Sequence, residues 1–212
     1  MARLSVLFKK AKGVFLVMLA VYVLSFGGGL LAGKLKVVDS AAIQKSRLVE
    51  FNRTLEYRVP GYGDILESYK TWHRPTMMRL LAKKDRWGLG LLIFFNNFIM
   101  ANTTMFVRAL TLLPMVLYPY GRFMQGVALA QTPAAARIVP VLITEFGGYF
   151  LVITATLCLW AWAIRPRAFG FSSRKEAIRG GFKLVGILWL VSAVFMALGA
   201  FFEVRMLLGL VK

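Results

Sequence analysis

Apolar residues in this chain come in long blocks of about twenty, and this feature restricts the fold more than any other. A block of that length, coiled as an α-helix, crosses a hydrocarbon layer about 30 Å thick. A soluble domain of 212 residues would instead spread its apolar residues over amphipathic elements. With 58% hydrophobic residues and a mean hydropathy of +0.66, the chain is predicted to be an integral membrane protein.

The blocks predict an all-α fold, a polytopic membrane helical bundle of about five transmembrane helices. They cover residues 13–33, 88–107, 109–131, 138–164 and 184–210. The first block follows a basic segment and so resembles a signal peptide, but it is longer than the usual signal core and no clear cleavage site follows it. We therefore expect it to be an uncleaved first helix.

Three regions follow from this pattern. Residues 1–33 are predicted to form a cytoplasmic N-terminus and the first transmembrane helix, residues 34–87 an extracytoplasmic helical insertion, and residues 88–212 a four-helix transmembrane core. The insertion carries 12 basic and 6 acidic residues. Its apolar residues have helical spacing at 39–57 and again at 76–87, and the intervening "VPGYGD" is typical of a helix break.

Basic residues set the expected orientation. With five spans, the N-terminus and the connection at 165–183 fall on the same side of the membrane, and they carry four and six basic residues. Such charge marks the cytoplasmic side of membrane proteins, so both are predicted to face the cytoplasm from a cell (inner) membrane. The insertion at 34–87 carries more basic residues than these two segments together, so the inverted orientation stays open.

Six polar or ionisable residues interrupt the apolar blocks at matching depths, roughly 9–14 Å below one face of the bundle at about 1.5 Å per helical residue. They are Asn96, Asn97, Arg122, Gln125, Glu145 and Glu203. Buried ions and amides are costly in a bilayer unless they are paired. Glu145 is therefore predicted to meet Arg122 or an asparagine amide across a helix interface, while a local pair between Glu203 and Arg205 stays open.

This polar layer has two interpretations. It could be an ion, proton or docking site that opens outward, or a satisfied network that fixes how the helices pack. The second is favoured, because polar residues in membrane bundles often serve packing alone.

The chain lacks the residues that most catalytic and metal centres require. Cys158 is its only cysteine and His73 its only histidine. This excludes an internal disulfide, and it leaves no multi-histidine metal site or Ser–His–Asp triad in the interior of the spans. "GGLLAGKL" at 28–35 nearly matches a phosphate-binding loop, but Leu35 replaces the required hydroxyl residue. Chance and a flexible helix end explain the near match better, and the glycines at 27–29 are interpreted as close-packing points or helix breaks. We expect no metal, no cofactor and no enzymatic activity.

The formal net charge of +18 favours lipid head groups over nucleic acid, because no nucleic-acid-binding motif accompanies it. The connection at 165–183 is a candidate surface for anionic lipid. Its basic residues are Arg165, Arg167, Arg174, Lys175, Arg179 and Lys183. The expected partners are the lipid bilayer, other membrane or envelope proteins and, as an open alternative, a second copy of the chain.

Short motifs in the core are similar to those of one known family. Phe94, Asn96 and Asn97 match an F-x-N-N element that opens the second span of the stage II sporulation protein M-like integral membrane family. Pro140 and Glu145 keep the two ends of its Pro-His-Gly-x-x-Glu element in the fourth span, although its His and Gly are replaced here.

Two further positions extend the resemblance, which covers residues 88–210. The family's Asn-Gly-x-x-x-Gly element would fall on Gly121 and Gly126, with the Asn replaced and the spacing one residue longer, and its last-span glutamate on Glu203. The resemblance implies a multi-span component without established enzymatic activity, which gathers partner proteins at a membrane. We therefore expect a non-enzymatic scaffold subunit; the alternative is a permease or channel subunit with a polar intramembrane site.

Overall fold

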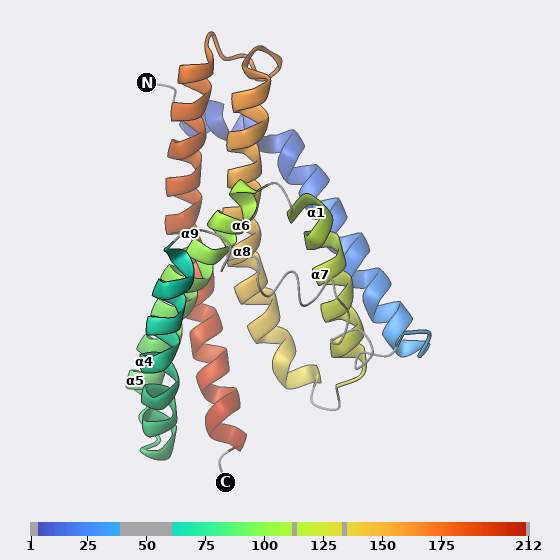
Figure 1. Ribbon diagram of the computed structural model, residues 1–212. Coiled ribbons are helices and arrows are strands. Elements are labelled where there is room, and N and C mark those ends of the chain that lie inside the picture. The colour runs from blue at the N-terminus through green and yellow to red at the C-terminus, as the bar shows by residue number, and fades with distance from the viewer. Residues whose placement is uncertain (1–3, 39–60, 112–113, 133–134, 211–212) are drawn as a thin grey trace.

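The computed structural model describes residues 4–38, 61–111, 114–132 and 135–210, and within these ranges all regular structure is helical (Figure 1). This confirms the predicted all-α bundle. Four helices are long and apolar enough to cross a membrane, namely Leu4–Lys34, Arg86–Leu110, Ala135–Ile164 and Arg174–Gly209. The predicted helix at 39–57 lies outside the described residues.

Helices α8 (Ala135–Ile164) and α9 (Arg174–Leu210) form an antiparallel hairpin (Figure 1). Small residues bring them together: a Cβ at Gly181 would lie 2.9 Å from the Cα of Leu159. The turn between them contains the short helix η3 (Pro166–Phe169). The capping box of Ser173 and Glu176 then begins α9: the Glu176 backbone N–H donates to Ser173 Oγ (3.2 Å), and the Glu176 carboxylate accepts from the backbone N–H of Ser172 (2.9 Å).

Helix α1 (Leu4–Lys34) packs along α7 (Pro114–Ala130) through glycines. A Cβ at Gly29 would lie 1.9 Å from the carbonyl oxygen of Phe123, and a Cβ at Gly126 2.3 Å from that of Phe26. Only glycine allows backbones to approach this closely. Of the two interpretations of the glycines at 27–29, close packing is therefore the one that the structure contains.

Helix α7 occupies the place of the predicted third span, 109–131. Its 17 residues extend about 26 Å, which is at the lower limit for crossing a bilayer. The helix before it ends at Leu110. Four spans are thus long and apolar in the described ranges, and the fifth stays a prediction.

Helix α4 is longer than the sequence indicates. We expected a helix at 76–87, but α4 covers Tyr62–Ala82, a turn follows at 83–85, and α5 begins at Arg86. Proline usually ends or kinks a helix. The structure instead accommodates Pro75 in the interior of α4.

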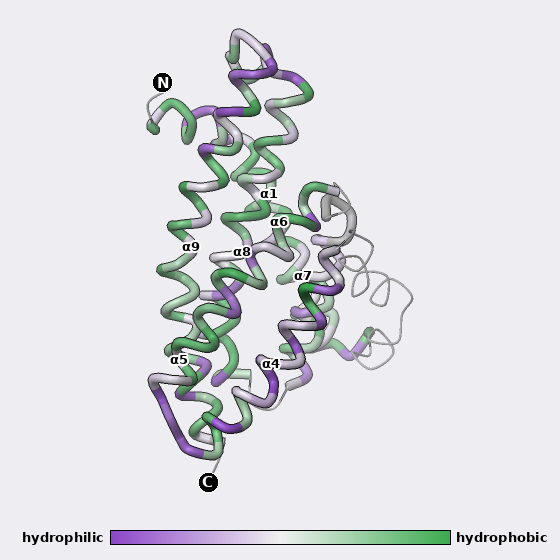
Figure 2. Tube along the Cα trace, turned by 60° about the vertical axis from the view of Figure 1, so that its left-hand side comes forward, coloured by the Kyte–Doolittle hydropathy of each residue, from purple (hydrophilic) through white to green (hydrophobic). Residues whose placement is uncertain are grey.

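Helix α4 runs antiparallel beside one long helical segment, made of α5 (Arg86–Phe95), η2 (Asn96–Ala101) and α6 (Asn102–Leu110). The hydroxyls of Tyr62 and Thr104 are hydrogen-bonded (2.7 Å), and Leu80 lies against Gly88 at the other end. Hydrophilic residues colour α4 and its turn into α5, whereas α9 is mostly hydrophobic (Figure 2). The polar helix α4 is therefore packed against Arg86–Leu110, which is one of the four apolar helices.

The N-terminus and the α8–α9 connection lie at one end of the molecule, and the C-terminus lies at the other (Figure 1). Leu7 shares a buried cluster with Trp162 and Phe171. Lys10 Nζ donates to the carbonyl of Gly170 (2.6 Å) and lies 4.2 Å from the centre of the Phe171 ring. The beginning of α1 and residues 165–183 thus lie at the same end of the molecule, and their placement on one side of a membrane stays a prediction.

Candidate functional site

A π-helical stretch, η2, places two adjacent asparagines at the centre of the molecule. It interrupts the Arg86–Leu110 helix at Asn96. Wider π-helical turns of this kind occur frequently at functional sites because they redirect side chains. Here Asn97 is buried, whereas Asn96 is partly exposed.

Hydrogen bonds connect these asparagines to both neighbouring helices. The Tyr69 hydroxyl, from α4, donates to Asn96 Oδ1 (2.9 Å). Asn96 Nδ2 donates to Asn97 Oδ1 (2.8 Å), and Asn97 Nδ2 donates to Glu145 Oε1 on α8. The asparagine alternative for the partner of Glu145 is therefore the one that the structure contains.

Glu203, from α9, completes this group because its carboxyl group lies within hydrogen-bonding reach of that of Glu145. A hydrogen bond between two carboxyl groups requires one of them to carry a proton. Gly199 makes the approach of α8 to α9 feasible, since a Cβ there would lie 3.1 Å from Glu145 Cγ. We call Tyr69, Asn96, Asn97, Glu145 and Glu203 the carboxyl network.

Arg122, from α7, does not pair with Glu145. Its guanidinium carbon lies 4.2 Å from the centre of the Phe146 ring, 4.9 Å from that of Tyr118 and 5.9 Å from that of Tyr22. Arg122 Nε and Nη1 are buried and have no hydrogen-bond partner in the described part of the chain. Tyr149 is buried between the two groups, within electrostatic range of Glu145, Glu203 and Arg122.

Gln125, the last of the six predicted residues, lies one turn beyond Arg122 on α7. Its Oε1 is also buried without a partner, as is the Tyr118 hydroxyl one turn before Arg122. We call Tyr118, Arg122 and Gln125 the guanidinium site. The structure thus joins four of the six predicted residues directly and places the other two next to one another on a neighbouring helix.

Tyr69 is a member of the carboxyl network that the sequence analysis missed. Tyr62, Leu66, Tyr69 and His73 recur at the spacing of one helix face, and this signal could have predicted an inner face for α4. The His73 ring stacks on that of Tyr69, with 5.0 Å between ring centres. Burial lowers the pKa of His73 from its ordinary value of 6.5, and burial raises the pKa of Tyr69 to about 12.

The predicted lipid-contact residues lie together around the α8–α9 connection, and all six side chains are exposed. They are Arg165, Arg167, Arg174, Lys175, Arg179 and Lys183. The one acidic residue between them, Glu176, accepts hydrogen bonds from Ser172. The arrangement is a basic surface at the end of the bundle that also carries the N-terminus.

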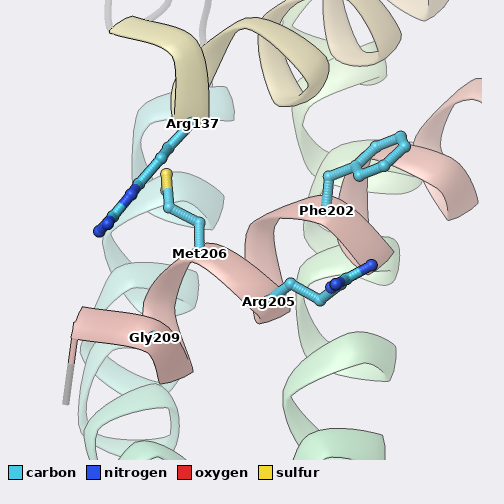
Figure 3. A pocket seen from close by; sticks show the side chains of 5 residues that line it. All are labelled: Arg137, Phe202, Arg205, Met206 and Gly209. Atoms are coloured by element: carbon cyan, nitrogen blue, oxygen red, sulfur yellow. The ribbon is translucent and has the colours of Figure 1, made fainter. Parts of the chain in front are cut away.

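A pocket of about 320 Å³ opens between α8 and α9 near the C-terminal end (Figure 3). Its lining is basic and apolar, and the side chains of Arg137 and Arg205 point to different sides (Figure 3). The residues are Arg137, Phe202, Arg205, Met206 and Gly209. Since none of them is an acid or a nucleophile, this lining offers no acid–base or covalent catalysis.

No three His, Cys, Asp or Glu side chains gather into a metal-binding group within the described ranges. Cys158 is a free, buried thiol. The chemistry that the described residues can offer in the interior is therefore hydrogen bonding, proton exchange between carboxyl groups, and attraction by one guanidinium.

The fold and the two polar groups define a class, an all-α protein with four helices able to cross a membrane and ionisable side chains between them. Comparison with protein-family models, curated proteins and solved structures finds no match to this chain. The resemblance to the stage II sporulation protein M-like family therefore stays a prediction.

Proposed function

We propose that this chain is a non-enzymatic subunit of a membrane-protein complex, in the cell envelope or a transport assembly, and that α4 recruits its partners. The observation that carries this proposal is the two-sided character of α4. Its inner face is fastened by hydrogen bonds from Tyr62 and Tyr69. Elsewhere on its surface, α4 exposes more than half of the side chains of Ile65, Trp72 and Met78.

A lipid environment is unfavourable for the exposed surface of α4. Charged residues alternate with the apolar ones, and Lys70 pairs with Glu67 on the surface (3.2 Å). Charges in a hydrocarbon environment are costly, whereas an exposed tryptophan among polar residues is typical of the centre of a protein–protein interface. A partner protein with an apolar pocket and complementary charge would cover both kinds of group.

The proposal includes an orientation in a cell (inner) membrane. The basic end that holds the N-terminus and residues 165–183 would face the cytoplasm, by the positive-inside rule. The turn between α4 and α5 lies at the opposite end (Figure 1), so this turn would face outward. The resemblance to a family of membrane scaffolds agrees with this layout and supports it as a proposal.

Co-purification from native membranes tests the recruitment. Trp72→Ala should remove the partners that copurify with the full-length chain, measured by quantitative mass spectrometry. Trp87→Ala is the matched control, because Trp87 is even more exposed but lies on α5. If Trp72→Ala retains every partner, α4 is not the recruiting surface.

A second candidate is a permease or channel subunit, and the carboxyl network favours it. Two carboxyl groups within hydrogen-bonding reach of one another, beside two amides in the bundle interior, are a candidate site for a proton or a cation. A second copy or a partner chain would be needed to complete a pathway. Glu145→Gln in reconstituted liposomes should then lower flux, whereas the exposed Glu67→Gln should not; unchanged flux in both contradicts this candidate.

A further inference from the structure

The guanidinium site is incomplete among the residues that the structure describes. Tyr118, Arg122 and Gln125 are spaced four and three residues apart on α7, so they share one helix face. The Tyr118 hydroxyl, Arg122 Nε and Nη1, and Gln125 Oε1 are all buried without a partner among the described residues. Buried polar atoms are usually hydrogen-bonded, so four such atoms on one face indicate that a group beyond the described residues is needed.

The positive charge of Arg122 indicates what kind of group is missing. Arg122 is only 7% exposed, and no carboxylate forms a salt bridge with it in the part of the chain that the structure describes. Glu145, the nearest candidate by sequence, is already held by Asn97 and Glu203. A buried guanidinium with no counter-charge is strongly unfavourable.

The surrounding rings satisfy only part of this need. Phe146, Tyr118 and Tyr22 cover the guanidinium and attract its charge through their ring faces. Tyr22 also lies within hydrogen-bonding reach of it. These contacts leave the edge formed by Nε and Nη1 without an acceptor, and they supply no negative charge.

We infer that Arg122 and Tyr118 bind one small monovalent anion, of the halide or short-carboxylate class. The free guanidinium edge and the phenol hydroxyl are all donors, so the missing group is an acceptor that carries charge. The rings that pack around Arg122 restrict the site to a small ion. Gln125 Oε1 is an acceptor and cannot bind an anion directly. A water molecule that enters with the anion would donate a hydrogen bond to it.

Thermal unfolding of the purified full-length chain in a neutral detergent tests this inference. Chloride or acetate should raise Tm in a saturable way, because a ligand that binds the folded state stabilises it. Gluconate at the same ionic strength is too large to enter and should not. Arg122→Gln should abolish the difference between the salts, whereas Arg205→Gln, an exposed arginine on α9, should retain it.

Tyr118→Phe provides a second variant in case Arg122→Gln does not fold. It keeps the ring and removes the hydroxyl, so the apparent affinity for chloride should fall about tenfold. Equal Tm of the wild type in chloride and gluconate would overturn the inference. An unchanged chloride effect in Arg122→Gln would also overturn it, since the anion would then bind the surface. Neither outcome bears on recruitment by α4.

Discussion

The carboxyl network and the guanidinium site are both within electrostatic range of Tyr149, yet they differ in how they are satisfied. Glu145 has partners from two other helices, Asn97 and Glu203. Arg122 has aromatic rings around it and two N–H groups without an acceptor. The first group closes on itself, whereas the second depends on something outside the described chain. Removing a member should therefore harm the first and relieve the second.

The largest effect is expected at Glu145. Glu145→Leu removes an acceptor from Asn97 and leaves Glu203 buried without its partner, so it should lower the free energy of unfolding by about 3–5 kcal/mol. Glu145→Gln keeps a group that can accept from Asn97 and donate to Glu203, and should cost about 1 kcal/mol. Unfolding by a denaturing detergent measures both. Equal losses would show that the network is held by packing alone.

Arg122 should behave in the opposite way. In a buffer whose only anion is gluconate, which is too large for the site, Arg122→Met replaces an unpaired buried charge with an apolar side chain of similar length. Such replacements are often neutral or stabilise a protein by about 1–4 kcal/mol. The same detergent titration measures the sign of the change. A clear destabilisation would mean that the rings already satisfy the guanidinium, and the contrast between the two groups would disappear.

Two glycines of α9, Gly199 and Gly186, provide a third comparison, because only Gly199 lies where α8 approaches α9 at the carboxyl network. Gly199→Ala adds a Cβ 3.1 Å from Glu145 Cγ and 3.2 Å from Thr144 Oγ1, so it should cost about 1–3 kcal/mol through overpacking. Gly186→Ala, on the same helix, meets nothing within 4 Å and should stabilise by up to about 1 kcal/mol. A loss of equal size at both positions would exclude the contact with Glu145 as the cause.

The sequence is sufficient to predict the layer but not the pairing within it. Apolar blocks predict which segments are long enough to cross a membrane, and a rise of about 1.5 Å per residue predicts the depth of each polar side chain. Depth does not fix rotation about the helix axis. Arg122 and Glu145 therefore have matching depth but face different neighbours, and the Asn96–Asn97 π-helix has no signal in residue spacing.

The docking of α4 could not be predicted for a different reason. Its charged residues are typical of a helix in water, and its apolar stripe is as narrow as that of a surface helix. Tyr69 fits that pattern equally well whether α4 lies apart from the core or against it. Only the position of Asn96, on another helix, gives the Tyr69 hydroxyl its partner.

The smallest predicted effect concerns the link between α4 and the carboxyl network. His73 stacks on Tyr69, the outermost member of the network, and its burial lowers its pKa below 6.5. The folded state therefore binds fewer protons than the unfolded state in the window below pH 6.5. Stability should be complete above that pH and fall as the pH decreases, until His73 is also protonated in the folded protein. Tm measured against pH should show this loss in the wild type and not in His73→Gln.

Since the hydroxyl of Tyr69 keeps its proton throughout, with a pKa of about 12, Tyr69→Phe should lower Tm by a constant amount and leave the pH dependence in place. An identical pH profile in the wild type and in His73→Gln would mean that the pKa of His73 does not differ between the folded and unfolded states.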